Sequence, residues 1–513
     1  MNGAEALART LVAAGVEVCF ANPGTSEMHF VSALDRVAGL RCVLGLAETV
    51  AAGCADGYGR MAGKPAATLL HCGPGLANGL ANFHNARRAF TPIVSIVGDQ
   101  ATYHRPLDAP LTADTAALAR TVWHGVRTSA TTAEVAPDAA AAVQAALAPP
   151  GGIATLVLPA DCAWNEGAQP AAALAPAKRV AAAPETIRDI ARVLRTGDPA
   201  LLLLASEALG EAGLRAAQRV AHASGARLRT PTQVPRMARG RGRVAVDRIP
   251  YVVDAALKVL EGTKHLILAG AKAPVGFFAY PGKPSVLWPR DCTVHVLARV
   301  EQDVVAALDA LADELGAPPV APLRETGPAP EAQRGPFKPE AFGHTLAALL
   351  PEQAIVAEDA VTSGRALFAL TFAAAPHDWM QVTGGAIGHA FPAATGAALA
   401  CPQRKVVCLQ ADGAGMYSLQ ALWTQARERL DVVNVVFANR RYAILQGELA
   451  AVGATPGPAS RELFDLARPE IRWTRLAEGM GVEAARVDTL EAFDDVFRAA
   501  CARRGPFLIE FLI

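Results

Sequence analysis

The sequence predicts an α/β protein made of three doubly wound domains, each built on a parallel sheet. Apolar, β-branched segments alternate with segments of helical apolar spacing along the chain. Two Ala- and Pro-rich stretches, 166–184 and 316–337, interrupt this alternation and are typical of linkers. A length of 513 residues, at roughly 150 residues per domain, agrees with about three domains. The expected domains are 1–165, 185–315 and 338–513.

The first expected domain alternates helix and strand from its first residues. Its expected helices are 4–14, 25–37, 49–61 and 76–89. Its expected strands are 17–21, 41–46, 66–71, 92–97 and 153–158. Strand–helix–strand units of this length make parallel sheets, in which the carboxyl ends of the strands meet at one edge. Residues that follow strands are therefore the candidates for a functional site.

The second and third expected domains continue the pattern. Strands are expected at 200–205, 265–269 and 294–297, and then at 354–357, 405–410, 432–438 and 506–513, with a helix over 417–429. The basic segment 237–243, Met-Ala-Arg-Gly-Arg-Gly-Arg, is expected to be a solvated loop. The alternative is a functional loop that contacts a cofactor or a neighbouring subunit.

Composition excludes several classes of partner. Lys+Arg and Asp+Glu are equal at 48 each, which disfavours nucleic acid and anionic membranes. Nine cysteines without a CxxC pair indicate reduced thiols in a cytoplasmic protein, neither a disulfide framework nor a zinc site. Glu5 and Arg9 mark the amino terminus as an amphipathic helix and not a signal peptide. No apolar stretch is convincing as a membrane span.

Polar residues follow two neighbouring strands of the third domain. Asp412-Gly413-Ala414-Gly415 comes after strand 405–410, and Asn439 ends strand 432–438. Parallel strands would bring Asp412 and Asn439 side by side, and their oxygens suit Mg²⁺. The glycines would let the backbone approach a phosphate. The alternative for an Asp-Gly pair after a strand is an ordinary turn.

This arrangement resembles the diphosphate-binding motif of thiamine diphosphate enzymes, Gly-Asp-Gly followed within thirty residues by Asn. Ala411 replaces the first glycine, and Asn439 lies twenty-seven positions after Asp412. The resemblance implies three Mg²⁺ ligands: Asp412, Asn439 and the backbone carbonyl of Arg441. It also implies a set of residues beside the diphosphate, namely Gly413, Ala414, Asn439 and the hydroxyl of Thr362, with Ser363 next to it.

Glu48 follows an expected strand and opens an expected helix, where the helix dipole alone would favour a carboxylate. The same helix contains Ala-Asp-Gly-Tyr-Gly-Arg at 55–60, which resembles a segment of the same enzyme family. The resemblance implies that Glu48 bonds N1′ of the cofactor pyrimidine, so that the 4′-imino group can take the C2 proton. A dry pocket lets a carboxyl share a proton with a ring nitrogen.

Two further strand ends resemble benzoylformate decarboxylase. The loop Asn-Pro-Gly-Thr-Ser-Glu at 22–27 places Thr25 where that family has a serine facing the substrate carboxylate; otherwise Thr25 is a helix cap. His71 occupies the position of a histidine that handles protons, although a histidine at a strand end is more often structural. Asn78 matches an asparagine near the pyrimidine.

The glycine-rich segment 384–394 leads into a helix of small residues. Without the resemblance it would be a flexible loop before a packed helix. The resemblance implies that the Gly385 carbonyl accepts from the 4′-amino group. It also makes Ile387 the aliphatic wedge that holds the cofactor bent.

The resemblance spans nearly the whole chain, as pyrimidine-binding, central and diphosphate-binding domains. It implies a homodimer or homotetramer with active sites at the subunit interface and a 2-oxo acid substrate. We expect an acetolactate synthase-like carboligase, in which the cofactor ylid adds to the 2-oxo acid, CO₂ leaves and the acyl carbanion attacks a second carbonyl. The alternative is a benzoylformate decarboxylase-type enzyme that releases an aldehyde. FAD is not expected, because its contacts are not recognisable.

Signatures of both subfamilies are incomplete. His71 favours the decarboxylase, but segment 273–280 lacks that subfamily's second histidine. Segment 108–113 lacks the Ala-Phe-Gln-Glu stretch of acetolactate synthases. The sequence is also compatible with an inactive binding or regulatory subunit, suggested by Ala411, and with an NAD oxidoreductase. The oxidoreductase interpretation rests on Gly73-Pro-Gly, Gly79 and Asp99, and would leave Glu48 without a role.

Overall fold

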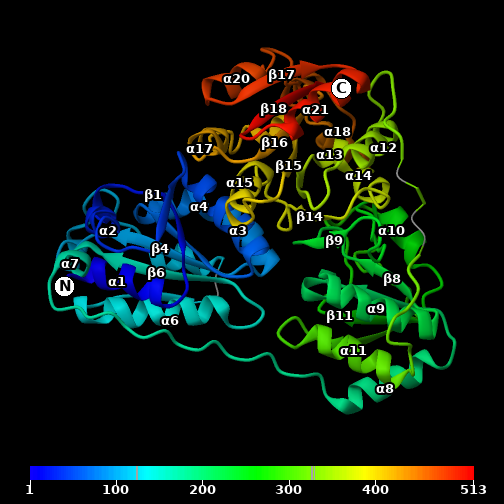
Figure 1. Ribbon diagram of the computed structural model, residues 1–513, viewed down its shortest axis with the longest axis horizontal. Coiled ribbons are helices and arrows are strands. Elements are labelled where there is room, and N and C mark those ends of the chain that lie inside the picture. The colour runs from blue at the N-terminus through cyan, green and yellow to red at the C-terminus, as the bar shows by residue number, and fades with distance from the viewer. Residues whose placement is uncertain (123–124, 325–326, 329) are drawn as a thin grey trace.

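The computed structural model describes residues 1–122, 125–324, 327–328 and 330–513. The expected linker 316–337 therefore lies partly outside the described residues. Three mainly parallel sheets flanked by helices confirm the predicted α/β class (Figure 1). Between Trp164 and Pro184 the chain crosses from the first sheet to the second without a helix or strand. Among the described residues, no helix has both the length and the apolar character to span a membrane.

The first sheet is wholly parallel, with strand order β2-β1-β3-β4-β6-β5. Its strands are β1 Val18–Asn22, β2 Arg41–Leu44, β3 Ala66–Leu70, β4 Ile93–Asp99, β5 Gly125–Thr128 and β6 Ile153–Pro159. Its helices are α1 Gly3–Ala13, α2 Met28–Leu34, α3 Glu48–Ala62, α4 Cys72–Ala89, α5 Thr115–Arg120, α6 Val135–Leu147 and α7 Ala160–Trp164. The expected helix over 25–37 is divided into the 3₁₀ turn η1, Thr25–Glu27, and α2. The sequence missed β5, because this short edge strand has no buried residue to give an apolar run.

The second sheet is also parallel, with order β10-β8-β7-β11-β12. Its strands are β7 Ala200–Leu204, β8 Arg227–Thr230, β10 Asp247–Arg248, β11 His265–Ala269 and β12 Thr293–Ala298. Helices α8 Pro184–Leu194, η4 Ser206–Leu209, α9 Glu211–Ser224, α10 Val253–Leu260 and α11 Val304–Glu314 surround it. The strands β8 and β10 were not predicted, because they are short and polar and give no apolar run.

The third sheet has seven strands in the order β17-β18-β16-β15-β13-β14-β9. Its strands are β9 Met237–Arg239, β13 Ile355–Asp359, β14 His377–Gln381, β15 Val406–Ala411, β16 Val432–Ala438, β17 Glu483–Val487 and β18 Phe507–Leu512. The larger helices are α12 Pro339–Leu349, α15 Ala390–Ala400, α17 Ala421–Arg427, α18 Ala443–Ala451, α19 Pro458–Leu463, α20 Trp473–Gly479 and α21 Leu490–Ala502. Three single turns, α13 Val361–Gly364, α14 Leu367–Leu370 and α16 Asp412–Gly415, follow strands or connect elements.

The expectation of a solvated loop over 237–243 was wrong. Its first three residues form β9, which pairs antiparallel with β14 and closes one edge of the third sheet. Arg239 is fully buried, with its guanidinium 3.7 Å from the centre of the Phe368 ring. Burial lowers the pKa of Arg239 well below its usual value. The basic pattern misled because the aromatic partner of Arg239 lies far along the chain.

Helices α3 and α15 join the first and third domains (Figure 1). A Cβ atom at Gly57 would lie 2.0 Å from the Ala393 carbonyl oxygen, and one at Gly396 would lie 1.9 Å from the Cys54 carbonyl oxygen. Both distances are far inside van der Waals contact. Glycine at these positions therefore allows the two helices to pack backbone against backbone.

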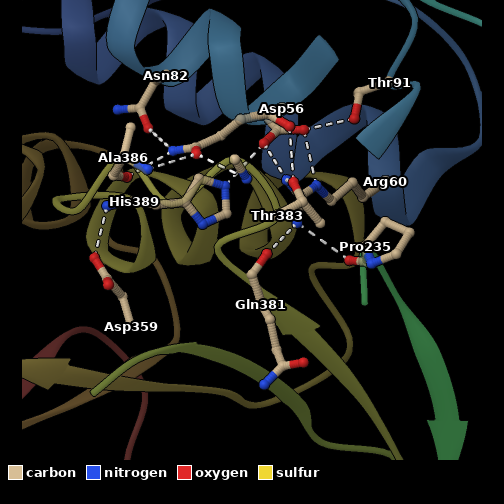
Figure 2. A network of polar contacts seen from close by, with 12 residues as sticks. Asp56, Arg60, Asn82, Thr91, Pro235, Asp359, Gln381, Thr383, Ala386 and His389 are labelled. Atoms are coloured by element: carbon tan, nitrogen blue, oxygen red, sulfur yellow. Dashed lines mark hydrogen bonds and ion pairs between the residues drawn. The ribbon is translucent and has the colours of Figure 1, made fainter. Parts of the chain in front are cut away.

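A buried network of charged residues stabilises the same interface between the first and third domains (Figure 2). Asp56 has no exposed surface, and its carboxylate accepts hydrogen bonds from Arg60 Nη2 at 2.6 Å, His389 Nε2 at 2.8 Å and Thr91 Oγ1 at 2.5 Å. Burial by itself would raise the pKa of Asp56, but Arg60 and His389 hold it at about 2. The carboxylate is therefore ionised in the folded protein.

Arg60 extends this network to the third sheet. Its Nη1 donates to the carbonyl oxygens of Gln381 at 2.7 Å and Pro235 at 3.2 Å, and its Nη2 donates to Thr383 Oγ1 at 3.0 Å (Figure 2). Helix α3 is thus bonded to β14, to the segment before β9 and to the loop that follows β14.

We predict that Asp56→Asn destabilises the protein by about 3–5 kcal/mol, because it leaves the buried Arg60 guanidinium without its charge partner. Denaturant unfolding would measure this loss. The matched control is Asp189→Asn, which removes the exposed ion pair with Arg192 and should cost less than about 1 kcal/mol. Equal midpoints for the two variants would contradict the assigned importance of the network.

A second buried carboxylate should make stability pH-dependent. Burial raises the pKa of Asp359 to about 7, above its ordinary value of 3.8. Its stabilising contribution is complete below pH 3.8 and is lost as the pH rises through 7. Asn at this position keeps an acceptor but does not ionise. Relative to Asp359→Asn, the wild type should therefore lose roughly 3 kcal/mol between pH 5 and pH 8. Thermal unfolding at both pH values checks this, and parallel profiles would refute it.

Candidate functional site

The carboxyl edge of the third sheet brings Asp412 and Asn439 into one small region. β15 and β16 pair in parallel, so the residues that follow them lie at the same edge. Asp412 is 3% exposed, and its carboxylate accepts from the backbone N–H of Gly413 at 2.8 Å and of Arg440 at 2.6 Å. Asn439 Oδ1 accepts from the Arg441 N–H at 3.1 Å.

The donor set at this edge fits a hard divalent cation. Burial raises the pKa of Asp412, although backbone N–H groups oppose the shift. Among the described residues, no Lys, Arg or His forms an ion pair with this carboxylate. A buried carboxylate beside an amide oxygen, not ion-paired with a cationic side chain, is a suitable environment for Mg²⁺.

The backbone after β15 is closely covered. A Cβ atom at Gly413 would lie 2.5 Å from the Tyr442 ring, so only glycine fits there. A Cβ atom at Gly388 would lie 3.4 Å from the Ala414 carbonyl oxygen, which makes the loop before α15 a neighbour of this turn.

Thr362 and Ser363 lie in α13, just beyond the carboxyl end of β13. Val361 precedes them with a φ of 47°. A β-branched residue in the left-handed region is strained, and such strain is concentrated at functional segments. Because β13 pairs in parallel with β15, the two hydroxyl groups lie at the same sheet edge as Asp412.

The loop that carries Gly385 and Ile387 contacts the central domain. Gly385 has a φ of 77°, and a Cβ atom there would lie 2.8 Å from Phe277 Cζ. The Asp359 carboxylate accepts from the N–H groups of Gly388 at 2.7 Å and His389 at 3.0 Å. The loop is therefore hydrogen-bonded to Asp359 of its own sheet and lies against the Phe277 ring of the central domain.

A hydrogen-bonded clamp also joins the central domain to α18. The hydroxyl groups of Tyr251 and Tyr280 donate to the Glu448 carboxylate at 3.0 and 2.8 Å. Tyr251 packs against Phe277, with ring centres 5.3 Å apart.

Glu48 stands at the start of α3, on the first domain. Its Oε2 accepts from Asn78 Nδ2 at 3.2 Å. A Cβ atom at Gly75 would lie 3.1 Å from Glu48 Oε1, so the glycine leaves room for the carboxylate. Glu48 is half-buried and Asn78 is exposed in the single chain.

His71 belongs to a compact polar group near Glu48. Its Nδ1 lies 3.1 and 3.2 Å from the two carboxylate oxygens of Glu27 and 3.1 Å from Ser26 Oγ. Glu27 is 1% exposed and also accepts from the Gly24 N–H at 2.7 Å. Thr25 is exposed at the start of η1. The sequence reasoning missed Glu27, although it is the last residue of the loop 22–27 that was singled out.

The strained residue Cys72 follows His71. Its φ is 54°, in the left-handed region, and its Sγ lies 3.3 Å from Ser26 Oγ. Burial raises the pKa of the Cys72 thiol, which therefore stays protonated.

The predicted site residues form two groups within one chain. The first-domain group contains Thr25, Glu48, His71 and Asn78, and the third-domain group contains Thr362, Gly385, Ile387, Asp412, Gly413, Ala414, Asn439 and Arg441. No hydrogen bond or ion pair between described residues joins a side chain of one group to a side chain of the other. Thr25 and Asn78 of the first group and Arg441 of the second are exposed in the single chain.

The glycines behind the dinucleotide interpretation do not form a loop. Gly73 and Gly75 lie in the first turn of α4, and Asp99 is ion-paired with Arg105 at 2.6 Å. The carboxylate of Asp99, the acidic residue of that interpretation, is therefore already paired with an arginine side chain.

Comparison with known proteins identifies the family. Residues 1–118 match the N-terminal TPP binding domain of thiamine pyrophosphate enzymes, and residues 362–511 match their C-terminal TPP binding domain. A Mycobacterium tuberculosis protein, IlvX, whose name groups it with acetolactate synthase large subunits, is 51% identical over 100% of this chain and 99% of its own. Benzoylformate decarboxylase of Pseudomonas aeruginosa is 27% identical over 97% and 96% of the two chains.

A solved structure shows the same fold over the whole length. The 4-hydroxybenzoylformate decarboxylase of Rhodococcus jostii superposes with a TM-score of 0.88 at 24% identity, covering 99% of this chain and 98% of its own. The full-length match to IlvX and the two matched domains establish that the chain belongs to the thiamine diphosphate-dependent enzymes.

Proposed function

We propose that this protein is a Mg²⁺- and thiamine diphosphate-dependent decarboxylase of 2-oxo acids that releases an aldehyde. The observation that carries this proposal is the pairing of His71 with the buried Glu27, a proton-handling group at the strand edge beside Glu48. An aldehyde product requires a proton at the former carbonyl carbon, and this pair is able to supply it.

The first-domain group and the third-domain group would bind different parts of the cofactor. The third-domain group would hold the metal and diphosphate, and Glu48 and Asn78 would hold the pyrimidine. When bound, thiamine diphosphate supplies a carbanion that attacks the 2-oxo carbonyl and accepts the electrons left by CO₂. The metal ligands would be Asp412, Asn439 and the Arg441 carbonyl, with Thr362, Gly413 and Ala414 beside the diphosphate.

Glu48 would keep a proton at the pyrimidine ring nitrogen. A carboxyl group shares a proton with a ring nitrogen most readily when water is excluded. Glu48 is only half-buried in one chain, so a second copy of the chain would complete its surroundings. This requirement supports active sites shared between two copies, in a homodimer or a homotetramer.

Glu27 would set the tautomer of His71. Because its carboxylate faces Nδ1, it favours a proton on that nitrogen and leaves Nε2 free to exchange a proton with the reacting molecule. Thr25, exposed at the start of η1, would meet the substrate carboxylate with its hydroxyl group. Loop 22–27 is fixed by Glu27, which accepts from the Gly24 N–H.

Carboligation of the acetolactate synthase type is the second candidate. It is favoured by the 51% identity to IlvX and by the absence of histidine from segment 273–280, whose Phe277 lies against Gly385. With one proton donor fewer near the cofactor, a second carbonyl would compete more successfully with a proton for the acyl carbanion.

A product assay tests the proposal. Protein with thiamine diphosphate and Mg²⁺ should convert one member of a panel of 2-oxo acids to CO₂ and the aldehyde, read by NMR. Glu48→Gln should lower kcat by about 10²–10⁴-fold, because it removes the group that shares the ring proton. Glu340→Gln, an exposed first-turn carboxylate of α12, is the control and should be fully active. Equal turnover by Glu48→Gln would refute the assigned site.

His71→Ala separates the two candidate reactions. For a decarboxylase, the rate of aldehyde release should fall about 10²–10⁴-fold. When an acceptor aldehyde is added, a larger share of the 2-oxo acid that is consumed should end as hydroxyketone than in the wild type. His344→Ala, in α12 on the third domain, serves as the control. An unchanged aldehyde rate would remove His71 from the mechanism, and hydroxyketone as the wild-type product would favour the carboligase.

A further inference from the structure

Asn85 lies near the end of α4, on the first domain, and is completely buried. Neither its position nor its residue type indicated from the sequence that it contributes to the site. Its side chain reaches the third domain and contacts the loop that follows β14. This loop, residues 383–387, contains Gly385 and Ile387.

The loop is bonded to Asn85 through several of its peptide groups. Asn85 Oδ1 accepts from the N–H groups of Gly384 at 3.1 Å and Ala386 at 3.2 Å, and Nδ2 donates to the Ala386 carbonyl at 2.8 Å. Thr383 Oγ1 donates to the Asn85 backbone carbonyl at 2.8 Å. A Cβ atom at Gly384 would lie 2.6 Å from Asn85 Oδ1, so glycine is needed for this approach.

The Asn85 amide has no spare hydrogen-bonding capacity. A primary amide offers two donors and two acceptor lone pairs, and the fourth contact is Nδ2 to Asn82 Oδ1 at 3.1 Å. Alanine would leave the loop groups unpaired. Aspartate would place a buried charge against the Ala386 carbonyl, which is worse. Asparagine is therefore the residue that this position requires.

The bonds fix the part of the loop that matters for the cofactor. Gly385, with its left-handed backbone, lies between the two residues that Asn85 holds. On the far side of Ile387, Asp359 holds Gly388 and His389. The segment is thus anchored at both ends, by Asn85 from the first domain and by Asp359 from its own sheet.

The same amide pair reaches the start of α3. Asn82 Nδ2 donates to the Thr49 carbonyl at 2.9 Å and to Thr49 Oγ1 at 3.1 Å, and Thr49 follows Glu48 in the chain. Figure 2 shows Asn82 and Ala386 on the two facing domains. Asn82 and Asn85 therefore connect the Glu48 helix with the 383–387 loop.

We infer that Asn85 is a positioning residue that orients the Gly385 peptide and Ile387 to receive the cofactor pyrimidine. This inference rests on the proposed cofactor site. It predicts that Asn85 contributes to thiamine diphosphate binding through the loop, without touching the metal and diphosphate residues around Asp412.

The test compares Asn85→Ala and Asn85→Asp with the control Asn434→Ala. Asn434 is equally buried and hydrogen-bonded, to Gln425 and the Phe507 carbonyl, but lies within β16 away from the loop. Titrations with Mg²⁺ and either thiamine diphosphate or inorganic diphosphate give the dissociation constants. Both Asn85 variants should bind thiamine diphosphate at least about tenfold more weakly, as the loss of one or more buried hydrogen bonds requires. Their affinity for inorganic diphosphate, and both affinities of Asn434→Ala, should stay within about twofold of the wild type.

Hydrogen exchange in cofactor-free protein provides a second readout. In the wild type, the Gly384 and Ala386 amides should exchange as slowly as those inside α4, because they are bonded to it. In Asn85→Ala their protection should fall at least about tenfold. Fast exchange of these amides in the wild type would overturn the inference even if the variants fail to fold. Unchanged thiamine diphosphate affinity in the variants would also overturn it, whereas a wild type that does not bind the cofactor would overturn the proposed function.

Discussion

The buried Asp56 carboxylate is the interaction on which the arrangement of the site depends. Helix α3 begins at Glu48 and carries Asp56 and Arg60 further along, so one helix both presents a candidate catalytic carboxyl and binds the third domain. Asp56 accepts a hydrogen bond from His389, which lies two residues after the 383–387 loop. Removing two charges from water is costly, and the cost is offset only while Arg60, Asp56 and His389 remain together. The interface therefore has one stable geometry.

Close packing and charge act together at this interface. The glycines of α3 and α15 allow backbone contact, which brings α4 near enough for Asn85 to hold the loop around Gly385. A side chain at Gly57 or Gly396 would separate the helices and break these hydrogen bonds. The position of a peptide expected to hold the cofactor is thus set by residues that would not touch the cofactor.

The sequence was most informative where an apolar strand ends in a polar residue. Strand 432–438 was predicted with its observed bounds, and the proximity of Asp412 and Asn439 follows from parallel pairing. Glu27 and Asn85 were not recognised because their partners are distant in the chain: Glu27 lies 44 residues from His71, and Asn85 lies 299 residues from Gly384. Arg239 was misjudged, since a basic run gives no sign that aromatic rings will bury it. Long-range contacts of polar residues have no local pattern.

In the proposed function, Glu48 of one copy and Asp412 of another copy would serve the same active site. Subunit complementation tests it most directly: Glu48→Gln and Asp412→Asn, each inactive, are co-expressed and the hybrid is assayed for CO₂ release. If sites are shared, each hybrid dimer has one site with neither substitution, and the mixture should recover about a quarter of wild-type activity. If each chain forms its own site, every site carries a substitution, and a mixture as inactive as its parents would contradict the claim.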